Sequence, residues 1–136
     1  MSESAPYALP VRVYFQDTDA GGVVYHASYV NFMERARTEW LREVYGYNHA
    51  GMIKELGVGF VVRSMKIDYL KPAVLDDLLY VSAEVNEIGR SRVTVRQSVK
   101  RGEETLVEGE IHLVCVNIES FRPVPVPEGL RSQWKG

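Results

Sequence analysis

Residues 26–45 carry apolar side chains with a helical period. These recur at spacings of three and four residues, over about five turns, at Tyr29, Phe32, Met33, Ala36, Trp40, Leu41, Val44 and Tyr45. Charged residues fill many of the other positions, so one side of the helix should face a core. We expect the helix to begin between His26 and Ser28, with Ser28 as its N-cap, and to end before Gly46.

Outside this segment the apolar positions largely alternate, which predicts strands. The alternating runs lie at residues 10–16, 58–71, 78–88, 90–101 and 105–118. In the first run, alternation places Val11, Val13 and Phe15 on one face. A second, short helix is expected at residues 48–56, and residues 122–127 should be extended because proline biases the preceding residue away from helix.

One strand, one long helix and about four further strands joined by short turns make an α+β pattern. Short connections favour antiparallel pairing, so the helix should pack against a single antiparallel sheet. The chain has 136 residues, which fits one domain spanning residues 1–136. A domain this small leaves part of its sheet and helix uncovered, so we expect it to oligomerise.

The last two predicted strands must pair with their apolar faces on the same side of the sheet. This requires odd residues to oppose odd residues, because a slip of one residue turns every side chain to the other face. A three-residue loop at 102–104, with Arg101 opposite Thr105, satisfies the condition, whereas a two-residue loop does not. Arg96 then faces Glu110, and cross-strand charge pairing accounts for that arginine without a ligand.

Arg90 and Arg92 lie on the same strand and have no such partner. In this register Arg92 faces Val114, and no acidic residue faces either arginine across the hairpin. Both are therefore candidates for contacts with an anionic ligand. The alternatives are plain solvent exposure, or pairing with Glu84 or Glu87 of the neighbouring strand.

The composition is that of an ordinary globular protein, with 46% hydrophobic and 25% charged residues. The 18 acidic and 16 basic residues give a net charge of −2, so overall charge does not indicate a nucleic-acid partner. No apolar run reaches the roughly 18 residues that a membrane span needs, and residues 1–6 lack the features of a signal peptide. We therefore expect a protein of the cytoplasm.

The only cysteine, Cys115, lies in an apolar run and is interpreted as a buried hydrophobe rather than a catalytic thiol. His49 and His112 show no metal-ligand spacing with each other or with Cys115. We expect no metal site and no cofactor.

The candidate chemistry lies in residues 17–25, between the first strand and the long helix. A carboxylate held ahead of a helix start lies near free backbone N–H groups and positive potential. Asp19 could act there as a general base toward water or as a nucleophile on an acyl carbon. The backbone N–H of Tyr25, His26 or Ala27 could stabilise the oxyanion that forms.

The same residues have simpler interpretations. Asp17 and Asp19 lie close to two adjacent glycines, and from chemistry alone both aspartates would be assigned to turn formation and capping. His26 could serve as a general acid, as a hydrogen-bond donor to substrate, or through its backbone only. Glu34 could be a second carboxylate near the site or an exposed helix residue.

Residues 17–29 read DTDAGGVVYHASY, and residues 34–39 read ERARTE. These stretches resemble the 4-hydroxybenzoyl-CoA thioesterase family of hotdog-fold proteins, and more closely the bacterial acyl-CoA thioesterases associated with the Tol–Pal system. The similarity extends over nearly the whole chain, through residues 60–63, 72–73, 75–77 and 114–116. This resemblance outweighs the turn-forming interpretation of Asp19.

The resemblance implies a hotdog fold, in which a curved antiparallel sheet of about five strands wraps a long central helix. It also implies homodimers or homotetramers with active sites at subunit interfaces. It assigns the catalytic carboxylate to Asp19 and the N–H that polarises the thioester carbonyl to His26. It places Arg90 and Arg92 where the family contacts the nucleotide and phosphates of CoA, and Tyr25 remains a substrate-binding candidate.

The main hypothesis is hydrolysis of acyl-CoA thioesters to a free acid and CoA, with short-chain or aromatic acyl groups favoured. Asp19 would act as a nucleophile through an acyl-enzyme anhydride, or as a base for water, and the weak basicity of carboxylates favours direct attack. An alternative is a module that binds acyl carrier protein or envelope-associated partners, with incidental hydrolysis. A third possibility is a hotdog hydratase, whose motifs are not evident.

Overall fold

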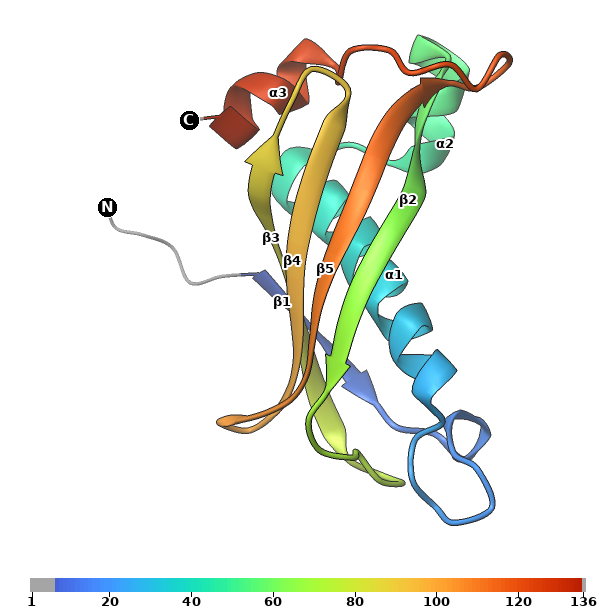
Figure 1. Ribbon diagram of the computed structural model, residues 1–136, viewed down its shortest axis with the longest axis vertical. Helices are drawn as coiled ribbons and strands as arrows, with labels where there is room; N and C mark the ends of the chain where they lie inside the picture. The colour runs from blue at the N-terminus through green and yellow to red at the C-terminus, as the bar shows by residue number, and fades with distance from the viewer. Residues whose placement is uncertain (1–6, 136) are drawn as a thin grey trace.

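The computed structural model describes residues 7–135, and a five-stranded sheet forms its centre (Figure 1). The strands follow the order β1-β3-β4-β5-β2 across the sheet. Their bounds are Tyr7–Arg12 (β1), Val58–Tyr69 (β2), Leu78–Ile88 (β3), Arg92–Arg101 (β4) and Glu104–Asn117 (β5). Every neighbouring pair is antiparallel. The strand order places β1 and β2 at the two edges of the sheet. The expected α+β class is confirmed.

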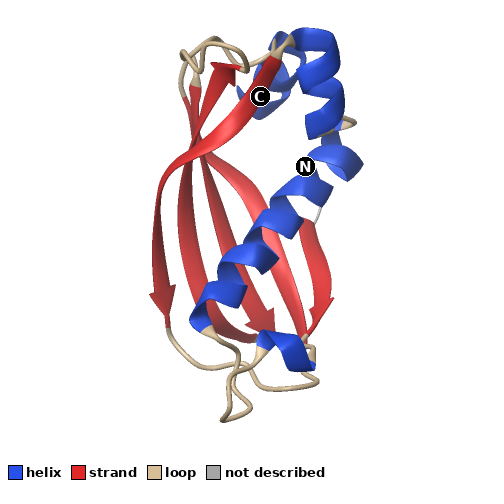
Figure 2. Cartoon of the chain, turned by 90° about the vertical axis from the view of Figure 1, so that its right-hand side faces the viewer, coloured by secondary structure: helices blue, strands red, loops and turns tan. Residues whose placement is uncertain are grey.

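One long helix, α1 (His26–Tyr45), crosses a face of the curved sheet, as Figure 2 shows from the side. Shorter helical segments are η1 (Phe15–Asp17, a 3-10 helix), α2 (His49–Gly51), η2 (Met52–Leu56, a π-helix) and α3 (Glu128–Lys135). Gly46 ends α1 in the left-handed region, with φ of 77°, as predicted. The predicted Ser28 cap is wrong, because Tyr25 is the N-cap and Ser28 lies within the first turn.

The apolar stripe of α1 packs on the sheet as predicted. Its buried members are Tyr29, Phe32, Met33, Ala36, Trp40 and Leu41. Val44 departs from the prediction and is 49% exposed. Gly109 of β5 allows close approach, because a Cβ there would lie 3.0 Å from the Met33 Cε. The helix therefore rests tightly on the middle of the sheet.

The β4–β5 hairpin confirms the predicted register and corrects the predicted loop. From residue 92 to residue 99 the pairing is as expected. The loop is a two-residue turn at 102–103, with Arg101 opposite Glu104. A bulge restores the register, because Leu106 lies opposite no residue of β4, and both Leu106 and Val107 are buried. One extra residue in β5 thus does what the longer loop was expected to do.

The first strand ends earlier than predicted. Val11 and Val13 are buried, but Phe15 is 81% exposed. The Tyr14 N–H donates a hydrogen bond of 2.8 Å to the Asp17 carboxylate, which turns the chain into η1. This local bond ends the alternation and corrects the prediction for Phe15.

The C-terminal helix α3 was not predicted. It follows the extended tail and buries Leu130 completely. The Trp134 ring stacks on the Trp40 ring, with centroids 5.7 Å apart and planes 1° from parallel. Because α3 is only eight residues long, its stability depends on these contacts rather than on its own sequence.

Cys115 is buried, as expected, and burial raises the pKa of its thiol to about 11. The thiol therefore stays protonated at neutral pH. Within residues 7–135, no helix is long and apolar enough to cross a membrane. The signal-peptide expectation concerned residues 1–6, which lie outside the described residues.

Candidate active site

A tight loop joins η1 to α1 and presents Asp19. An isolated β-bridge between Thr18 and Val24 closes it. Inside, the Asp19 N–H donates to the Val23 carbonyl (3.0 Å) and the Gly22 N–H donates to the Asp19 carbonyl (3.0 Å). Gly22 has φ of +83°, a conformation that favours glycine. These bonds fix the turn of the loop, and the Asp19 side chain is exposed.

The Asp19 carboxylate is exposed and accepts a single hydrogen bond from the described residues. Its Oδ1 accepts from the Gly21 N–H at 2.9 Å, which is an Asx-turn contact. Its Oδ2 has no partner among residues 7–135. The turn-forming interpretation and the catalytic interpretation are therefore compatible, because one oxygen orients the group and the other is free to react.

Asp17 differs from Asp19 because all of its contacts are internal. Its carboxylate accepts from the Tyr14 N–H, and its carbonyl accepts from the Tyr25 N–H (2.9 Å) and the Ser28 hydroxyl (3.3 Å). These bonds tie η1 to the start of α1. Asp17 thus links η1 to the start of α1 through its carbonyl and one carboxylate oxygen, as the turn-forming interpretation predicted.

The start of α1 leaves two backbone N–H groups free. The Tyr25 N–H is used by Asp17, and the Ser28 N–H donates to the Tyr25 carbonyl at 2.8 Å. The N–H groups of His26 and Ala27 have no acceptor among the described residues, as expected for the first turn of a helix. Of the three sequence candidates for an oxyanion donor, the structure therefore leaves His26 and Ala27.

The His26 imidazole lies in an aromatic setting. Its ring centroid is 4.6 Å from that of Tyr25, which is 51% exposed, and 6.1 Å from that of Tyr69. The Tyr69 hydroxyl donates to the His26 carbonyl at 3.2 Å. No side chain of the described residues hydrogen-bonds the imidazole. The ring is therefore part of an aromatic cluster at the start of α1, and Tyr25 contributes its ring rather than its N–H.

The segment 72–77, between β2 and β3, supports the loop from the other side. The Val24 N–H donates to the Ala73 carbonyl (2.9 Å), and the Leu75 N–H donates to the Gly22 carbonyl (3.1 Å). The Ala73 N–H donates to the Tyr29 hydroxyl at 2.9 Å. Sequence reasoning missed this support, although residues 72–73 and 75–77 were part of the similarity noted above.

Arg90 and Arg92 lie at the opposite end of the sheet from Asp19. The β3–β4 turn is beside α3, whereas the Asp19 loop is at the far end of α1 (Figure 1). Both arginines are exposed. Arg92 lines a groove of about 730 Å³ together with Arg63 and His112. Within one chain, the structure therefore does not bring the two arginines and the carboxylate together.

A small cavity of about 100 Å³ lies midway along α1. Trp40 and Phe60 line it together with Arg37 and His49. Phe32 instead is fully buried in the core. Glu34 is exposed and lines the rim of the same cavity, so it is a helix residue well away from the Asp19 loop.

A curved antiparallel sheet packed against one long helix is the arrangement of a hotdog fold. The thioesterase superfamily model matches residues 21–108. The chain belongs to this superfamily.

Individual relatives agree with this assignment. The acyl-CoA thioester hydrolase YbgC of Escherichia coli O157:H7 is 44% identical over 130 residues, which cover 95% of this chain and 96% of the relative. The acyl-CoA thioesterase YbgC of Haemophilus influenzae is 40% identical over 94% of this chain and 93% of its own. A probable thioesterase from Bartonella henselae superposes with a TM-score of 0.85 at 35% identity, over 90% of this chain and all of that one.

Proposed function

We propose that this protein, an acyl-CoA thioesterase, cleaves its substrate at the loop of residues 18–25. Asp19 is the catalytic carboxylate, and the N–H groups of His26 and Ala27 receive the thioester oxygen. One observation carries the proposal: backbone hydrogen bonds hold the loop in place, while one Asp19 oxygen and the N–H groups of His26 and Ala27 have no partner among residues 7–135. The relatives named as acyl-CoA thioester hydrolases support the substrate class.

The reaction proceeds by attack of a free Asp19 oxygen on the thioester carbonyl carbon. The C–S bond breaks, CoA leaves as a thiolate that takes a proton from water, and a mixed anhydride remains on Asp19. Water then hydrolyses the anhydride, which releases the carboxylic acid and restores the carboxylate. The alternative is that Asp19 removes a proton from the attacking water. The first route is favoured because carboxylates are weak bases at neutral pH.

The test replaces Asp19 with Asn. The Asn side chain keeps an oxygen for the Gly21 N–H but is neither a nucleophile nor a base, so kcat should fall at least about 100-fold. Asp17→Asn is the matched control, because its amide oxygen can still accept from Tyr14 and its turnover should stay near wild type. Near-wild-type turnover of Asp19→Asn would end the proposal. Single-turnover hydrolysis in ¹⁸O-water, with label tracked into Asp19, separates the two routes.

A homodimer formed through β2 is part of the proposal, with a tetramer as a further assembly. β2 is a 12-residue edge strand with exposed Val62, Met65 and Tyr69, and such edges pair with other strands. Antiparallel pairing centred near Ser64 places the Tyr69 end of one copy beside the Phe60 end of the other. The loop of one copy then lies near the 100 Å³ cavity of the second.

This arrangement has consequences for substrate choice. A cavity of about 100 Å³ accepts only a few heavy atoms, which favours short acyl groups over long chains, with small aromatic acids such as 4-hydroxybenzoate at the upper limit. The groove with Arg92 and Arg63 also lies beside the centre of β2, so a CoA phosphate bound there stays within reach of the interface. A panel of CoA esters of rising chain length tests the preference for short acyl groups, and equal turnover across the panel contradicts it.

The molecular mass of Ser64→Pro in solution tests the dimer through β2. A mass equal to that of the wild-type protein contradicts this dimer.

The cytoplasm is the compartment proposed for this activity, because acyl-CoA esters are made and used there. The association with the Tol–Pal system rests on the resemblance of residues 17–39. Binding of acyl carrier protein is the corresponding alternative function. Turnover near background on the CoA-ester panel, together with tight binding to acyl carrier protein in a titration, would favour that alternative over hydrolysis.

A further inference from the structure

We propose that Arg101 is a positioning residue for thioester cleavage, which holds the segment 72–77 so that this segment holds the Asp19 loop. The inference rests on the proposed role of Asp19 and adds a residue that lies outside the loop. Arg101 is the last residue of β4, at the tip of the β4–β5 hairpin. Three observations carry the proposal: the contacts of its guanidinium, the contacts of the segment, and the anchoring of the segment to β1.

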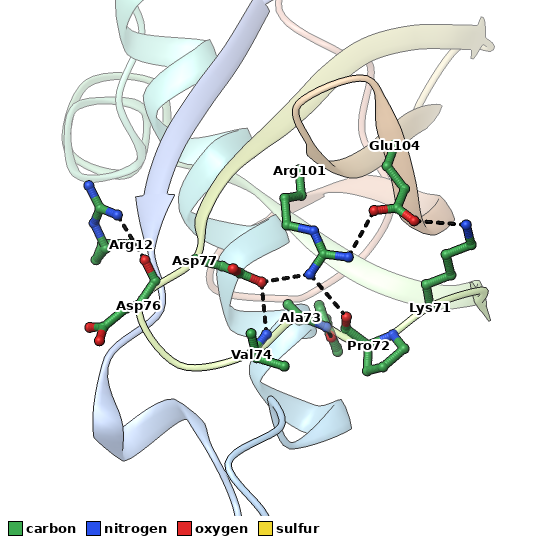
Figure 3. Close-up of polar contacts among 10 residues, drawn as sticks. Arg12, Lys71, Pro72, Ala73, Val74, Asp76, Asp77, Arg101 and Glu104 are labelled. Carbon is green, nitrogen blue, oxygen red and sulfur yellow. Dashed lines mark hydrogen bonds and ion pairs between the residues drawn. The ribbon is translucent and has the colours of Figure 1, made fainter.

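The Arg101 guanidinium spans two chain segments. Its Nη1 lies 2.8 Å from the Asp77 Oδ2 and donates to the Pro72 carbonyl at 3.4 Å. Its Nη2 lies 2.8 Å from the Glu104 Oε1 (Figure 3). The Asp77 and Glu104 carboxylates raise the pKa of Arg101, so it remains charged at every working pH. The hairpin tip and the segment 72–77 are thus joined through one side chain.

Arg101 contacts the segment on both sides of Ala73, and the Ala73 backbone is hydrogen-bonded to the loop. Pro72 precedes Ala73, and Val74 follows it with its N–H bonded to the Asp77 Oδ2 at 2.9 Å (Figure 3). Ala73 itself is fully buried, and its carbonyl and N–H are used by Val24 and Tyr29. A shift of either neighbour would therefore move the acceptor of the Val24 N–H.

Residues 22–24, the part of the Asp19 loop that leads into α1, are bonded along this same segment. Val23 forms an isolated β-bridge with Val74, and the Leu75 N–H donates to the Gly22 carbonyl. This limb leads within two residues to His26, where the free N–H groups lie. The position of the segment thus sets the distance between the Asp19 carboxylate and the helix start. An error of about 1 Å in such a distance can cost about 100-fold in rate.

The far end of the segment is anchored by backbone bonds to Val13, the residue that follows β1. The Val13 N–H donates to the Asp77 carbonyl (2.9 Å), and the Asp76 N–H donates to the Val13 carbonyl (3.1 Å). The Arg12 guanidinium donates to the Asp76 carbonyl at 2.8 Å (Figure 3). Asp76 has φ of 72°, so the turn there is tight. Arg101 holds the Asp77 carboxylate at this anchored end, and the same carboxylate oxygen accepts from the Val74 N–H beside Ala73. Arg101 therefore acts on the part of the segment that contacts the loop.

Lys71 provides a matched control within the same cluster. Its ammonium lies 2.7 Å from the Glu104 Oε2 and is more exposed than the Arg101 side chain, at 59% against 34%. Lys71→Met removes one ion pair of Glu104 and no hydrogen bond within the segment 72–77. Arg101→Met removes a charge of the same sign together with the contacts to Asp77 and Pro72.

The experiment measures kcat and KM for one acyl-CoA ester in the full chain, with the melting temperature of each variant. Arg101→Met should lower kcat about 10-fold and change KM less than threefold, because the substrate still binds but the reacting groups are misplaced. Lys71→Met should keep kcat within twofold. Arg101→Lys should be intermediate, since an ammonium cannot bridge both partners. Asp77→Asn keeps an oxygen for the Val74 N–H but loses the ion pair with Arg101, so its kcat should resemble that of Arg101→Met. It replaces Arg101→Met in the test if that variant does not fold.

The Asp19→Asn background separates the two proposals. If Arg101 acts through Asp19, adding Arg101→Met to Asp19→Asn should cause little further loss of kcat. A full additional 10-fold loss, or equal loss in Arg101→Met and Lys71→Met, would overturn the positioning role alone. Full activity of Asp19→Asn would instead overturn the proposed function, whatever Arg101 does.

Discussion

The two ends of α1 are held in place by different forces. At its start, the loop and the segment 72–77 are joined by backbone hydrogen bonds and by the ion pairs of Arg101. At its end, Trp40 stacks on Trp134 of α3, and Tyr45 lies edge-on to both rings. The start of α1 lies beside a loop with an exposed carboxylate, that of Asp19, whereas the end of α1 is packed among aromatic rings.

The difference shows how one small domain separates chemistry from stability. Hydrogen bonds are directional, so they can fix a loop in the open while leaving chosen atoms unpaired. Apolar contacts have no such direction, and their contribution grows with the area removed from water. Changes at the start of α1 should therefore affect kcat, and changes at the end of α1 should affect the free energy of unfolding. Four predictions test this contrast.

The largest effect is expected for His26→Pro. Proline is accepted at the first position of a helix, and Tyr25 already has the extended conformation, with ψ of 134°, that a following proline requires. The change removes one free N–H, so kcat should fall about 100- to 1000-fold with helix content retained by circular dichroism. His26→Ala keeps the N–H and should lower kcat far less. If His26→Ala is as damaging, the imidazole rather than the backbone is required.

The next effect is expected at the other end of the helix, for Leu130→Ala. This side chain is fully buried in the cluster with Leu41, Met52 and Cys115. Its truncation should lower the free energy of unfolding by about 3 kcal/mol in urea titrations. The kcat of the folded protein should be unchanged. A loss of kcat without loss of stability would contradict the division between the two ends.

Smaller effects are expected for the exposed arginines. Arg90→Ala and Arg92→Ala should each raise KM for CoA esters about fivefold, the upper size of one solvent-exposed ion pair, and leave KM for short pantetheine esters unchanged. The control is Arg96→Ala, because Arg96 pairs across strands with Glu84 and Glu110. Equal changes in KM for both ester types would remove the phosphate-contact proposal.

The smallest effect concerns Cys115 and appears only at high pH. Burial raises its pKa from 9.0 to about 11, so the folded state holds its proton where the unfolded state releases it. The contribution to stability is complete below about pH 9 and is lost as pH rises toward 11, by roughly 1 kcal/mol at pH 10. Unfolding curves of wild type should show this loss relative to Cys115→Ala. Parallel curves from pH 8 to pH 10 would contradict the prediction, as would labelling of the native thiol by iodoacetamide at pH 8.

Much of the fold could be predicted because it depends on periodicity. The stripe of α1 and its end at Gly46 follow from residues three and four apart and from one left-handed glycine. The β4–β5 register followed from parity, and the structure bears it out from Arg92 to Val99. The errors lie where a local bond or a bulge interrupts the pattern, at Phe15 and at Leu106.

The site was predicted less completely. Asp19 and the helix start are neighbours in the chain, so their proximity could be inferred from the sequence. Which N–H groups are free could not, because the Tyr25 N–H is bonded to Asp17, eight residues earlier, through a turn that alternation does not indicate. The distance between the Asp19 loop and Arg92 within one chain is also a property of the topology.

By itself the sequence determined the five strands, the long helix with its apolar stripe and the β4–β5 register from Arg92 to Val99, because these depend on patterns within a few positions. It also indicated Asp19 and the helix start as the residues proposed for the chemistry. Only the tertiary structure decided which carboxylate oxygen and which N–H groups remain free, and that Arg101 reaches a segment 24 residues away to hold Asp77. Hydrogen-bond partners are chosen by distances between segments remote in the chain. Those distances exist only once the helix has packed on the sheet.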